Sequence, residues 1–215
     1  REETFFDLIQ AIELNSKIDR FRISSIEPNL LTPEIISFLA TSKRFVPHFH
    51  IPLQSGSNSV LRLMKRRYQR ELYVNRVSLI KSMMPNACIG VDVIVGHPGE
   101  TPEFFLETYQ FLQELDIAYL HVFPYSERPN TLATEILPKV DGSFKSERSK
   151  MLHILSDKKR RAFYESQIGK KGEVLFEESN ENGMMEGFSE NYVRFKSTYD
   201  PLLINTIQPV RYKSI

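Results

Sequence analysis

The run CIGVDVIV, from Cys88 to Val95, constrains the fold of this chain more than any other segment. It is a nearly continuous series of β-branched and apolar residues that only Asp92 interrupts. Such a series is typical of a strand that is buried on both faces of a parallel sheet. Parallel neighbours must be joined by crossover connections, which are usually helices, so the run predicts an α/β fold.

Three more strand-like segments are each followed by a short polar turn, which we call a corner. They are Arg20–Ile26, Phe49–Leu53 and Ala118–Phe123. The four strand starts, near 21, 48, 88 and 118, are about 27, 40 and 30 residues apart, the length of successive βα units. The helical spacing of apolar residues predicts helices over Thr4–Asn15, Glu34–Thr41, Arg70–Met84 and a segment that ends near Leu115. The pattern predicts part of a βα barrel or of a doubly wound sheet.

The character of the sequence changes after a long helix that we predict over Ser146–Gln167. The stretch before it, Pro138–Lys145, is predicted to be a loop. After Gly169 the apolar residues alternate with a period of two, and the turn Glu181-Asn182-Gly183 separates two of the short runs. This pattern predicts a small all-β module of barrel type. We therefore expect two domains, residues 1–165 and residues 166–215.

The overall charge does not point to any class of partner. The 28 Lys and Arg residues nearly balance the 27 Asp and Glu residues, for a net charge of +1, so a nucleic-acid partner has to be argued from local clusters. No stretch approaches the roughly 18 apolar residues that a membrane-spanning helix needs, and the start shows no signal peptide. We expect a cytoplasmic protein with no membrane partner. Because Arg1 opens directly into an amphipathic helix, we also expect a piece of a longer protein.

Metal-binding chemistry has little support in the residues. Cys88 is the only cysteine, so it cannot form an internal disulfide or hold an iron–sulfur cluster by itself. We expect a small buried side chain there. No pair of histidines has the helical spacing of a zinc site, and we expect no metal on His48, His50, His97 and His121.

Asp92 lies in the middle of the most apolar strand. An unpaired buried carboxylate costs several kcal/mol and would take up a proton instead. We therefore expect Asp92 to point into the barrel and to have a partner there. A structural carboxylate and an active-site group are both compatible with this position.

Four ordered segments resemble one known family: RFRISSIEPNLL, HFHIPLQSGSNSVLRLMKRRY, GVDVIVGHPGETPEFFLET and YLHVFPYSERPNTLA. In that order and spacing they resemble the second half of the radical S-adenosylmethionine (radical SAM) domain of tRNA methylthiotransferases. Residues Ile168–Ile215 resemble the RNA-binding TRAM domain of the same proteins. The resemblance implies a partial, TIM-like βα barrel of radical SAM type, followed by a small TRAM or OB-like β barrel.

The resemblance also implies an activity. Enzymes of this family insert sulfur and a methyl group at carbon 2 of a modified adenine next to the tRNA anticodon, using S-adenosylmethionine and two 4Fe–4S clusters. The motif YSERPNT resembles that of the threonylcarbamoyladenosine branch of the family more than that of the isopentenyladenosine branch. The ribosomal-protein branch is a third alternative. The family's CxxxCxxC motif is absent from this chain. We therefore expect a fragment with no catalytic residue of its own, inactive without the missing N-terminal domains.

By the same resemblance, the polar corners would bind S-adenosylmethionine. The protein has to contact the adenine, the ribose and the methionine group of this cofactor to orient it. The expected cofactor-binding residues are Ser24, Ser25, Glu27, Gln54, Ser55, Asp92, Gly96, Phe123 and Tyr125. The alternative is that such residues only cap strands and helices.

Basic and aromatic residues supply the expected substrate contacts. Arg66, Arg67 and Arg128 would pair with phosphate or with the substrate carboxylate, since a guanidinium presents a planar fork of donors. A solvated helix face is the alternative for the first two. Stacking aromatics with nearby cations suit loop RNA, here the tRNA anticodon stem-loop. In the β module these residues are Lys170, Lys171, Tyr192, Arg194 and Arg211.

Two other classes of function remain open at this point. The chain could be a tRNA-binding module only. It could also be a self-sufficient βα-barrel enzyme such as an aldolase, but that class needs eight βα units and a strand-end lysine, and neither is present.

Overall fold

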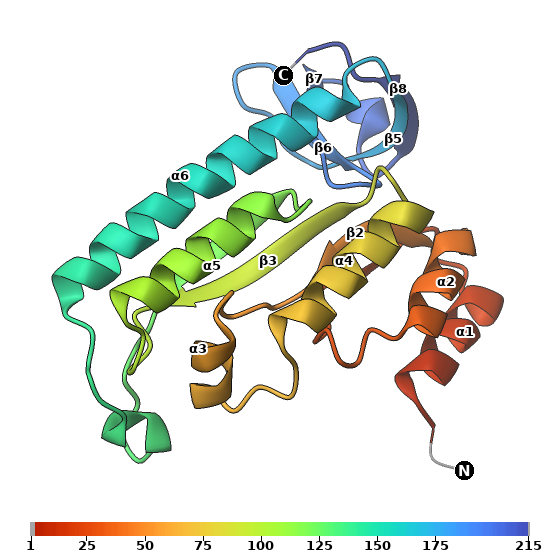
Figure 1. The fold of residues 1–215 in the computed structure, drawn as a ribbon. Coiled ribbons are helices and arrows are strands. Elements are labelled where there is room, and N and C mark those ends of the chain that lie inside the picture. Colours follow the sequence, from red (N-terminus) through yellow and green to blue (C-terminus); the bar gives the residue numbers. More distant parts are fainter. Residues whose placement is uncertain (1–2, 215) are drawn as a thin grey trace.

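The computed structural model describes residues 3–214, which form two four-stranded sheets joined by a long helix (Figure 1). The first sheet is parallel, in the order β1-β2-β3-β4. Its strands are β1 (Phe21–Ile23), β2 (Phe45–His50), β3 (Cys88–Val95) and β4 (Tyr119–Pro124). A strand order that follows the chain without reversal is that of a barrel segment. A doubly wound sheet would reverse its order.

Helices precede, connect and follow the strands of the first sheet. Their bounds are α1 (Phe5–Asn15), α2 (Pro33–Thr41), α3 (Asn58–Leu63), α4 (Arg70–Met83), α5 (Pro102–Glu114) and α6 (Gly142–Gln167), with short 3-10 turns η1 (Leu132–Glu135) and η2 (Pro201–Leu203). Local sequence explains the starts of α2 and α5. Thr32 and Thr101 each accept a backbone N–H as N-caps, and a proline follows at the first helical position.

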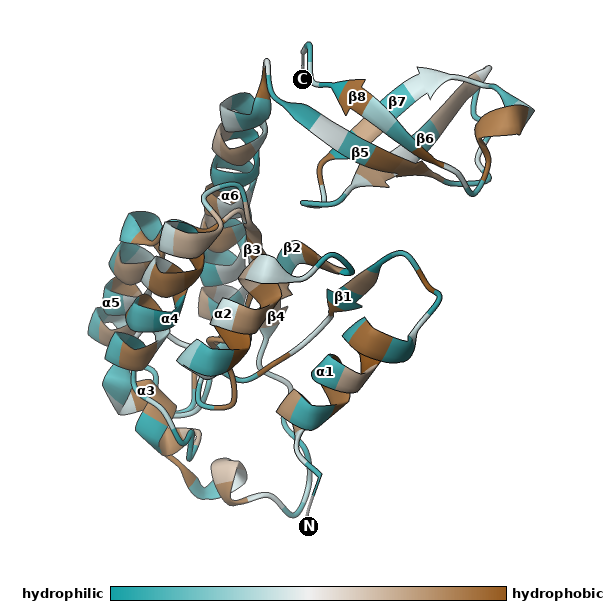
Figure 2. Cartoon of the chain, turned by 90° about the vertical axis from the view of Figure 1, so that its right-hand side faces the viewer, coloured by the Kyte–Doolittle hydropathy of each residue, from teal (hydrophilic) through white to brown (hydrophobic). Residues whose placement is uncertain are grey.

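The core lies between the helices and one face of the parallel sheet, which we call the outer face (Figure 2). Alternate residues of β3, such as Val91 and Val93, are fully buried there. The residues between them point to the opposite, inner face, where Asp92 and Ile94 are only half-buried. The prediction that both faces of β3 are buried is therefore wrong only for the carboxyl half of the inner face, which the helices do not cover, whereas Cys88 and Gly90 at the beginning of the strand are buried.

The free edge of β4 is closed by α6. Ser156 of α6 donates its hydroxyl to the Leu120 carbonyl at 3.0 Å and accepts the Leu120 N–H at 2.8 Å. The Ser156 side chain therefore satisfies both the N–H and the carbonyl of Leu120, which would otherwise pair with a further strand. α6 begins at Gly142 because Asp141 accepts the Ser143 N–H, so the loop predicted over Pro138–Lys145 is wrong for its last four residues.

The second strand also differs from its prediction. We expected Phe49–Leu53, whereas β2 ends at His50. The segment that follows still runs along β3: the Ile51 N–H donates to Gly90 O and the Leu53 N–H donates to Asp92 O. Pro52 between them faces the side of β1, where it has no N–H to donate.

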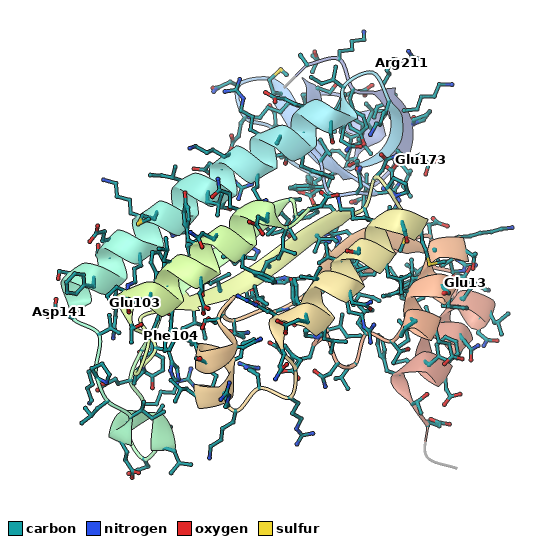
Figure 3. The ribbon with its side chains drawn as sticks, in the orientation of Figure 1. Glu13, Glu103, Phe104, Asp141, Glu173 and Arg211 are labelled. Atoms are coloured by element: carbon teal, nitrogen blue, oxygen red, sulfur yellow. The ribbon has the colours of Figure 1, made fainter. Side chains whose placement is uncertain are left out.

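The second sheet is antiparallel, in the order β7-β6-β5-β8, and curls on itself (Figure 1). Its strands are β5 (Lys171–Phe176), β6 (Met184–Ser189), β7 (Arg194–Thr198) and β8 (Ile207–Arg211). It docks where the parallel strands begin: Asn191 donates to Asn86 O at 3.1 Å, just before β3, and Arg20 lies 3.2 Å from Glu173. Figure 3 places Glu173 on the side near the first sheet and Arg211 farther out.

None of the helices within residues 3–214 combines the length and the apolar character needed to cross a membrane.

Candidate functional site

Polar side chains gather on the inner face of the parallel sheet. The register sets Asp92 of β3 beside His121 of β4, and Gly90 beside both His50 and Tyr119. His50 Nε2 lies 2.6 Å from Asp92 Oδ1, and the His50 and His121 rings are 5.1 Å apart between centroids. Asp92 therefore has the partner that its position in an apolar strand demands.

The inner face becomes more buried toward the beginning of the strands. His48 is 4% exposed, and its Nε2 lies 2.8 Å from the Tyr119 hydroxyl. Burial, followed by the nearby Arg22, lowers the pKa of His48 to about 3. The His48 ring also stacks on Tyr192 from the second sheet, 4.4 Å between centroids. A neutral histidine thus joins the two sheets.

We predict that acid destabilises the chain through His48. Its pKa is about 3 in the fold and 6.5 when unperturbed, so the unfolded chain binds more protons than the folded one between these values. The contribution of His48 is complete above the unfolded pKa and is lost as the pH falls toward the folded pKa. The loss is about 1.4 kcal/mol per pH unit, or about 2 kcal/mol from pH 6.5 to about 5. Urea unfolding at a series of pH values measures it.

A His48→Gln variant should show a shallower fall in stability over this range. Burial also lowers the pKa values of His97 and His121, so part of the slope remains. His153 is exposed on α6, and His153→Gln should keep the full slope. Equal slopes in the His48 variant and the parent chain would contradict the buried, neutral state of His48.

The corner that follows β3 is held by a buried ion pair. Glu100 is 2% exposed, contacts the Arg148 guanidinium of α6, and accepts the Gly96 N–H at 2.9 Å. Burial raises the pKa of the Glu100 carboxyl, while the Gly96 N–H and Arg148 act against this rise. Gly96 and Gly99 have φ values of +74° and +82°, a backbone conformation that favours glycine.

The corner after β2 lies beside the corner after β3. Gln54 has a φ of +71°, its N–H donates to Asp92 O at 2.8 Å, and its carbonyl accepts the Ile94 N–H. Ser55 is fully buried, and its hydroxyl lies 3.1 Å from that of Thr108 in α5. Ser55 therefore packs the corner against α5, whereas the half-buried Gln54 remains accessible.

The other predicted cofactor residues end up in different surroundings. Ser24 and Ser25 are exposed after β1. Phe123 is 51% exposed on the inner face, and the Tyr125 ring meets His97 edge-on at 5.1 Å. The structure therefore brings Gln54, Asp92, Gly96, Phe123 and Tyr125 to the carboxyl half of the sheet, as predicted for parallel strands.

Glu27 forms an ion pair with one of the predicted substrate residues, because Arg66 Nη1 lies 2.8 Å from its Oε1. The pair links the end of β1 to the segment after α3. Arg67 and Arg128 are exposed.

The predicted RNA residues divide into two groups. Tyr192 stacks on Phe188 at 4.7 Å and lies under the Arg22 guanidinium at 4.3 Å. Its ring therefore takes part in the contact between the sheets. Arg194 contacts Glu186, and both Arg194 and Arg211 line a groove of about 710 Å³ on the second sheet.

Lys170 and Lys171 lie at the start of the second sheet, where both are exposed. Lys170 donates to Asn86 Oδ1 at 2.7 Å, across the contact between the sheets.

Sequence reasoning missed several residues that shape the site. The His50–Asp92 contact depends on strand register, which one sequence does not reveal. Arg148 is one of many basic residues on α6, and nothing in its spacing marks it out. For Arg22 a signal existed, since its alternation with Phe21 and Ile23 places it on the inner face.

Thiolate chemistry does not fit the described residues. Cys88 is 2% exposed, and burial raises the pKa of its thiol to about 12, so it is a neutral packing residue. Within residues 3–214, no three His, Cys, Asp or Glu side chains are placed to share a metal ion.

The chain is similar to several known proteins. A profile of the radical SAM superfamily matches residues 2–112. The chain is 42% identical over 197 residues to threonylcarbamoyladenosine tRNA methylthiotransferase MtaB of Bacillus subtilis, covering 87% of this chain and 44% of that protein. It is 35% identical over 210 residues to tRNA-2-methylthio-N(6)-dimethylallyladenosine synthase of Pelotomaculum thermopropionicum, covering 96% of this chain and 46% of that protein. The chain thus spans less than half the length of these relatives.

Among solved structures, coproporphyrinogen III oxidase (HemN) of Escherichia coli, a radical SAM enzyme, is similar in fold. The TM-score is 0.58 at 19% identity, over 71% of this chain and 36% of that one.

Proposed function

Because this chain belongs to the radical SAM superfamily, we propose that it is the carboxyl-terminal part of a methylthiotransferase acting on carbon 2 of threonylcarbamoyladenosine in tRNA. The observation that carries the proposal is the 42% identity over 87% of the chain to a relative of that name. The relatives named for dimethylallyladenosine are similar at 35% identity, which makes that substrate the second candidate. The cytoplasm, where tRNA is modified, is the proposed location.

We assign residues 1–165 to the barrel and residues 166–215 to a TRAM-like domain. The consecutive parallel order of β1–β4 supports the first assignment, and the curled antiparallel sheet of β5–β8 supports the second. The inner face of the sheet would then line the interior of the barrel, on the side where the reaction takes place, which we call the reaction space.

The superfamily implies S-adenosylmethionine and an iron–sulfur cluster as cofactors. S-adenosylmethionine supplies a methyl group or, with the cluster, a radical. The residues at the carboxyl half of the sheet fit its polar and aromatic groups: Gln54 offers an amide, Phe123 an exposed ring, and the Gly96 corner a backbone that needs no side chain.

The cluster does not fit this chain. Its only cysteine is the buried, neutral Cys88. We propose that other segments of the whole protein supply the cluster ligands, and that the present chain is inactive alone.

The proposed RNA partner is an anticodon stem-loop. Support comes from the groove on the second sheet, which is lined by Arg194, Lys196, Arg211 and Lys213. Filter binding of a labelled stem-loop to the chain tests this partner. If about three phosphates are contacted, the affinity should fall about fourfold for each doubling of salt. A blunt duplex without a loop serves as the control and should bind more weakly. Absent or salt-independent binding would contradict the proposal.

A further inference from the structure

We propose that a small pocket between the two sheets binds one unstacked base of single-stranded RNA, with Arg160 on its phosphate. We call it the junction pocket. Its volume is about 210 Å³, and its lining includes Tyr119, Tyr164, Phe188, Tyr192, Arg160 and Arg194. This proposal rests on the proposed function, because it names how the RNA substrate is held beside the reaction space.

The size and the walls of the junction pocket favour a single planar group. Small-molecule sites usually begin at about 300 Å³, so the pocket is too small for a whole cofactor. Aromatic rings dominate its lining. Phe188 is half-buried and already stacked on Tyr192 at 4.7 Å, which makes it a fixed platform. Bases stack on such platforms whatever their sequence, because each base has a π face.

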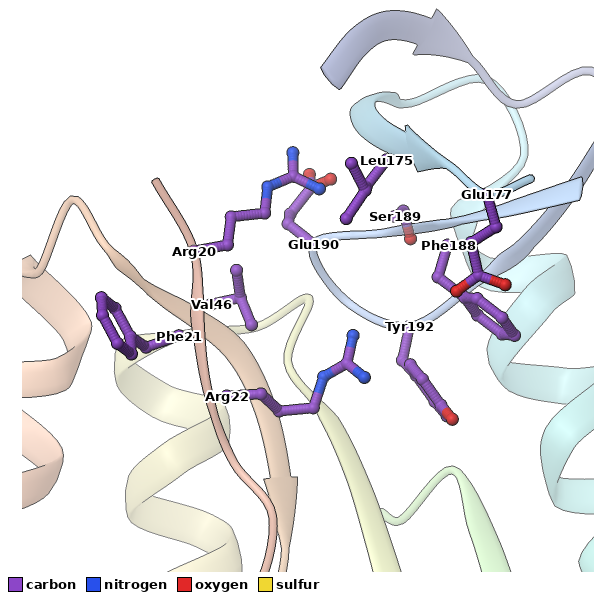
Figure 4. A pocket seen from close by; sticks show the side chains of 10 residues that line it. All are labelled: Arg20, Phe21, Arg22, Val46, Leu175, Glu177, Phe188, Ser189, Glu190 and Tyr192. Carbon is purple, nitrogen blue, oxygen red and sulfur yellow. The ribbon is translucent and has the colours of Figure 1, made fainter. Parts of the chain in front are cut away.

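The charge of the junction pocket favours an anion. The side chains that line it include Arg160 and Arg194, and no carboxylate. A second pocket of about 250 Å³ shares the wall formed by Phe188 and Tyr192 but has a balanced charge (Figure 4).

In that second pocket, arginines face carboxylates: the lining contains Arg20, Arg22, Glu177 and Glu190. Figure 4 shows Arg22 pointing toward Tyr192 from the side of the first sheet. The two pockets are similar in size and share the rings of Phe188 and Tyr192. The difference in charge favours the junction pocket for the phosphate of a nucleotide.

Arg160 is available for a phosphate. Its side chain is 47% exposed, and its only ion pair within the described residues is with Asp157 at 3.8 Å. Exposed pairs of this kind contribute little. The guanidinium lies 5.9 Å from the centroid of Tyr119 at the pocket wall, so it can reach a phosphate while the attached base stacks inside. Arg194 is held by Glu186 and shapes the wall.

The junction pocket also connects to the candidate site. His121 lines it and, on the inner face, its ring lies 5.1 Å from that of His50, which is hydrogen-bonded to Asp92. An RNA strand that places one base in the pocket can therefore extend along the inner face toward the carboxyl ends of the strands.

Fluorescence anisotropy with a labelled single-stranded RNA, carrying no modified base, tests the junction pocket on the present chain. Arg160→Gln should weaken binding about fivefold to tenfold and reduce the salt slope by about 1, as expected for a phosphate contact. Lys158→Gln is the matched control, because Lys158 is exposed on the same helix and lines no such pocket. Phe188→Leu should weaken binding about tenfold without changing the salt slope.

Equal affinities of the Arg160 and Lys158 variants would overturn the proposal while leaving the proposed tRNA partner intact. Failure of the unaltered chain to bind any RNA would overturn both. Should Phe188→Leu fail to fold, photo-crosslinking of 5-iodouracil RNA to the unaltered chain decides. Crosslinks are expected at Phe188 or Tyr164, and crosslinks confined to β8 would overturn the pocket.

Discussion

Replacing Arg148 by Ala is expected to destabilise the chain by about 3–5 kcal/mol, the largest effect of any single substitution that we predict. The side chains of Arg148 and of its partner Glu100 are 8% and 1% exposed. Removing the guanidinium leaves a buried carboxylate without its charged partner. The Gly96 N–H would remain its only donor among the described contacts. Urea unfolding followed by circular dichroism measures the loss.

The control for this substitution is Arg161→Ala on the same helix. Arg161 pairs with Glu165, but its side chain is 77% exposed, so water replaces the lost contact and no measurable loss is expected. A double variant, Glu100→Gln with Arg148→Met, should recover part of the stability because no charge is then left buried. An equal effect of the Arg148 and Arg161 substitutions would show that the buried pair does not hold the corner.

Replacing Gly90 by Val is expected to cost about 3 kcal/mol or more. A Cβ at Gly90 would lie 2.3 Å from the Tyr119 ring and 2.4 Å from its hydroxyl oxygen. Because no side chain tolerates such an approach, the Tyr119 ring has to move and give up its hydrogen bond to His48. The contact of the two sheets through His48 and Tyr192 should loosen as well.

Gly142→Ala provides the comparison for Gly90→Val. No atom lies within 4 Å of a Cβ built at Gly142, the first residue of α6, so this change should leave the stability unaltered or raise it slightly. Thermal unfolding of both variants tests the packing of the inner face. Unchanged stability of the Gly90 variant would contradict the close approach of Tyr119 to the strand.

Much of the first sheet could be predicted because its residues carry local signals. The continuous apolar run gave the bounds of β3 correctly, and the helix predicted over Glu34–Thr41 begins one residue after the observed start of α2. The spacing of the strands identified βα units. The choice of a barrel segment over a doubly wound sheet needed the strand order, which depends on contacts between residues far apart in the chain.

The site was predictable only in its location. Strand-end corners come together in any parallel sheet, so Gln54 and Gly96 could be grouped from the sequence. The His50–Asp92 contact and the stacking of His48 on Tyr192 could not be predicted, because they depend on register and on the docking of the second sheet. Arg148 was hidden among the basic residues of α6, where only burial sets it apart.

The measurement that tests the proposed function most directly is nucleoside mass spectrometry of tRNA. It compares a strain that lacks the gene for the whole protein with the same strain carrying it. The predicted result is that 2-methylthio-threonylcarbamoyladenosine is absent without the gene and restored by it, with its isopentenyl counterpart unchanged. Methylthiolation restored only on isopentenyladenosine would contradict the proposed substrate, and tRNA that is identical in both strains would contradict the proposed activity.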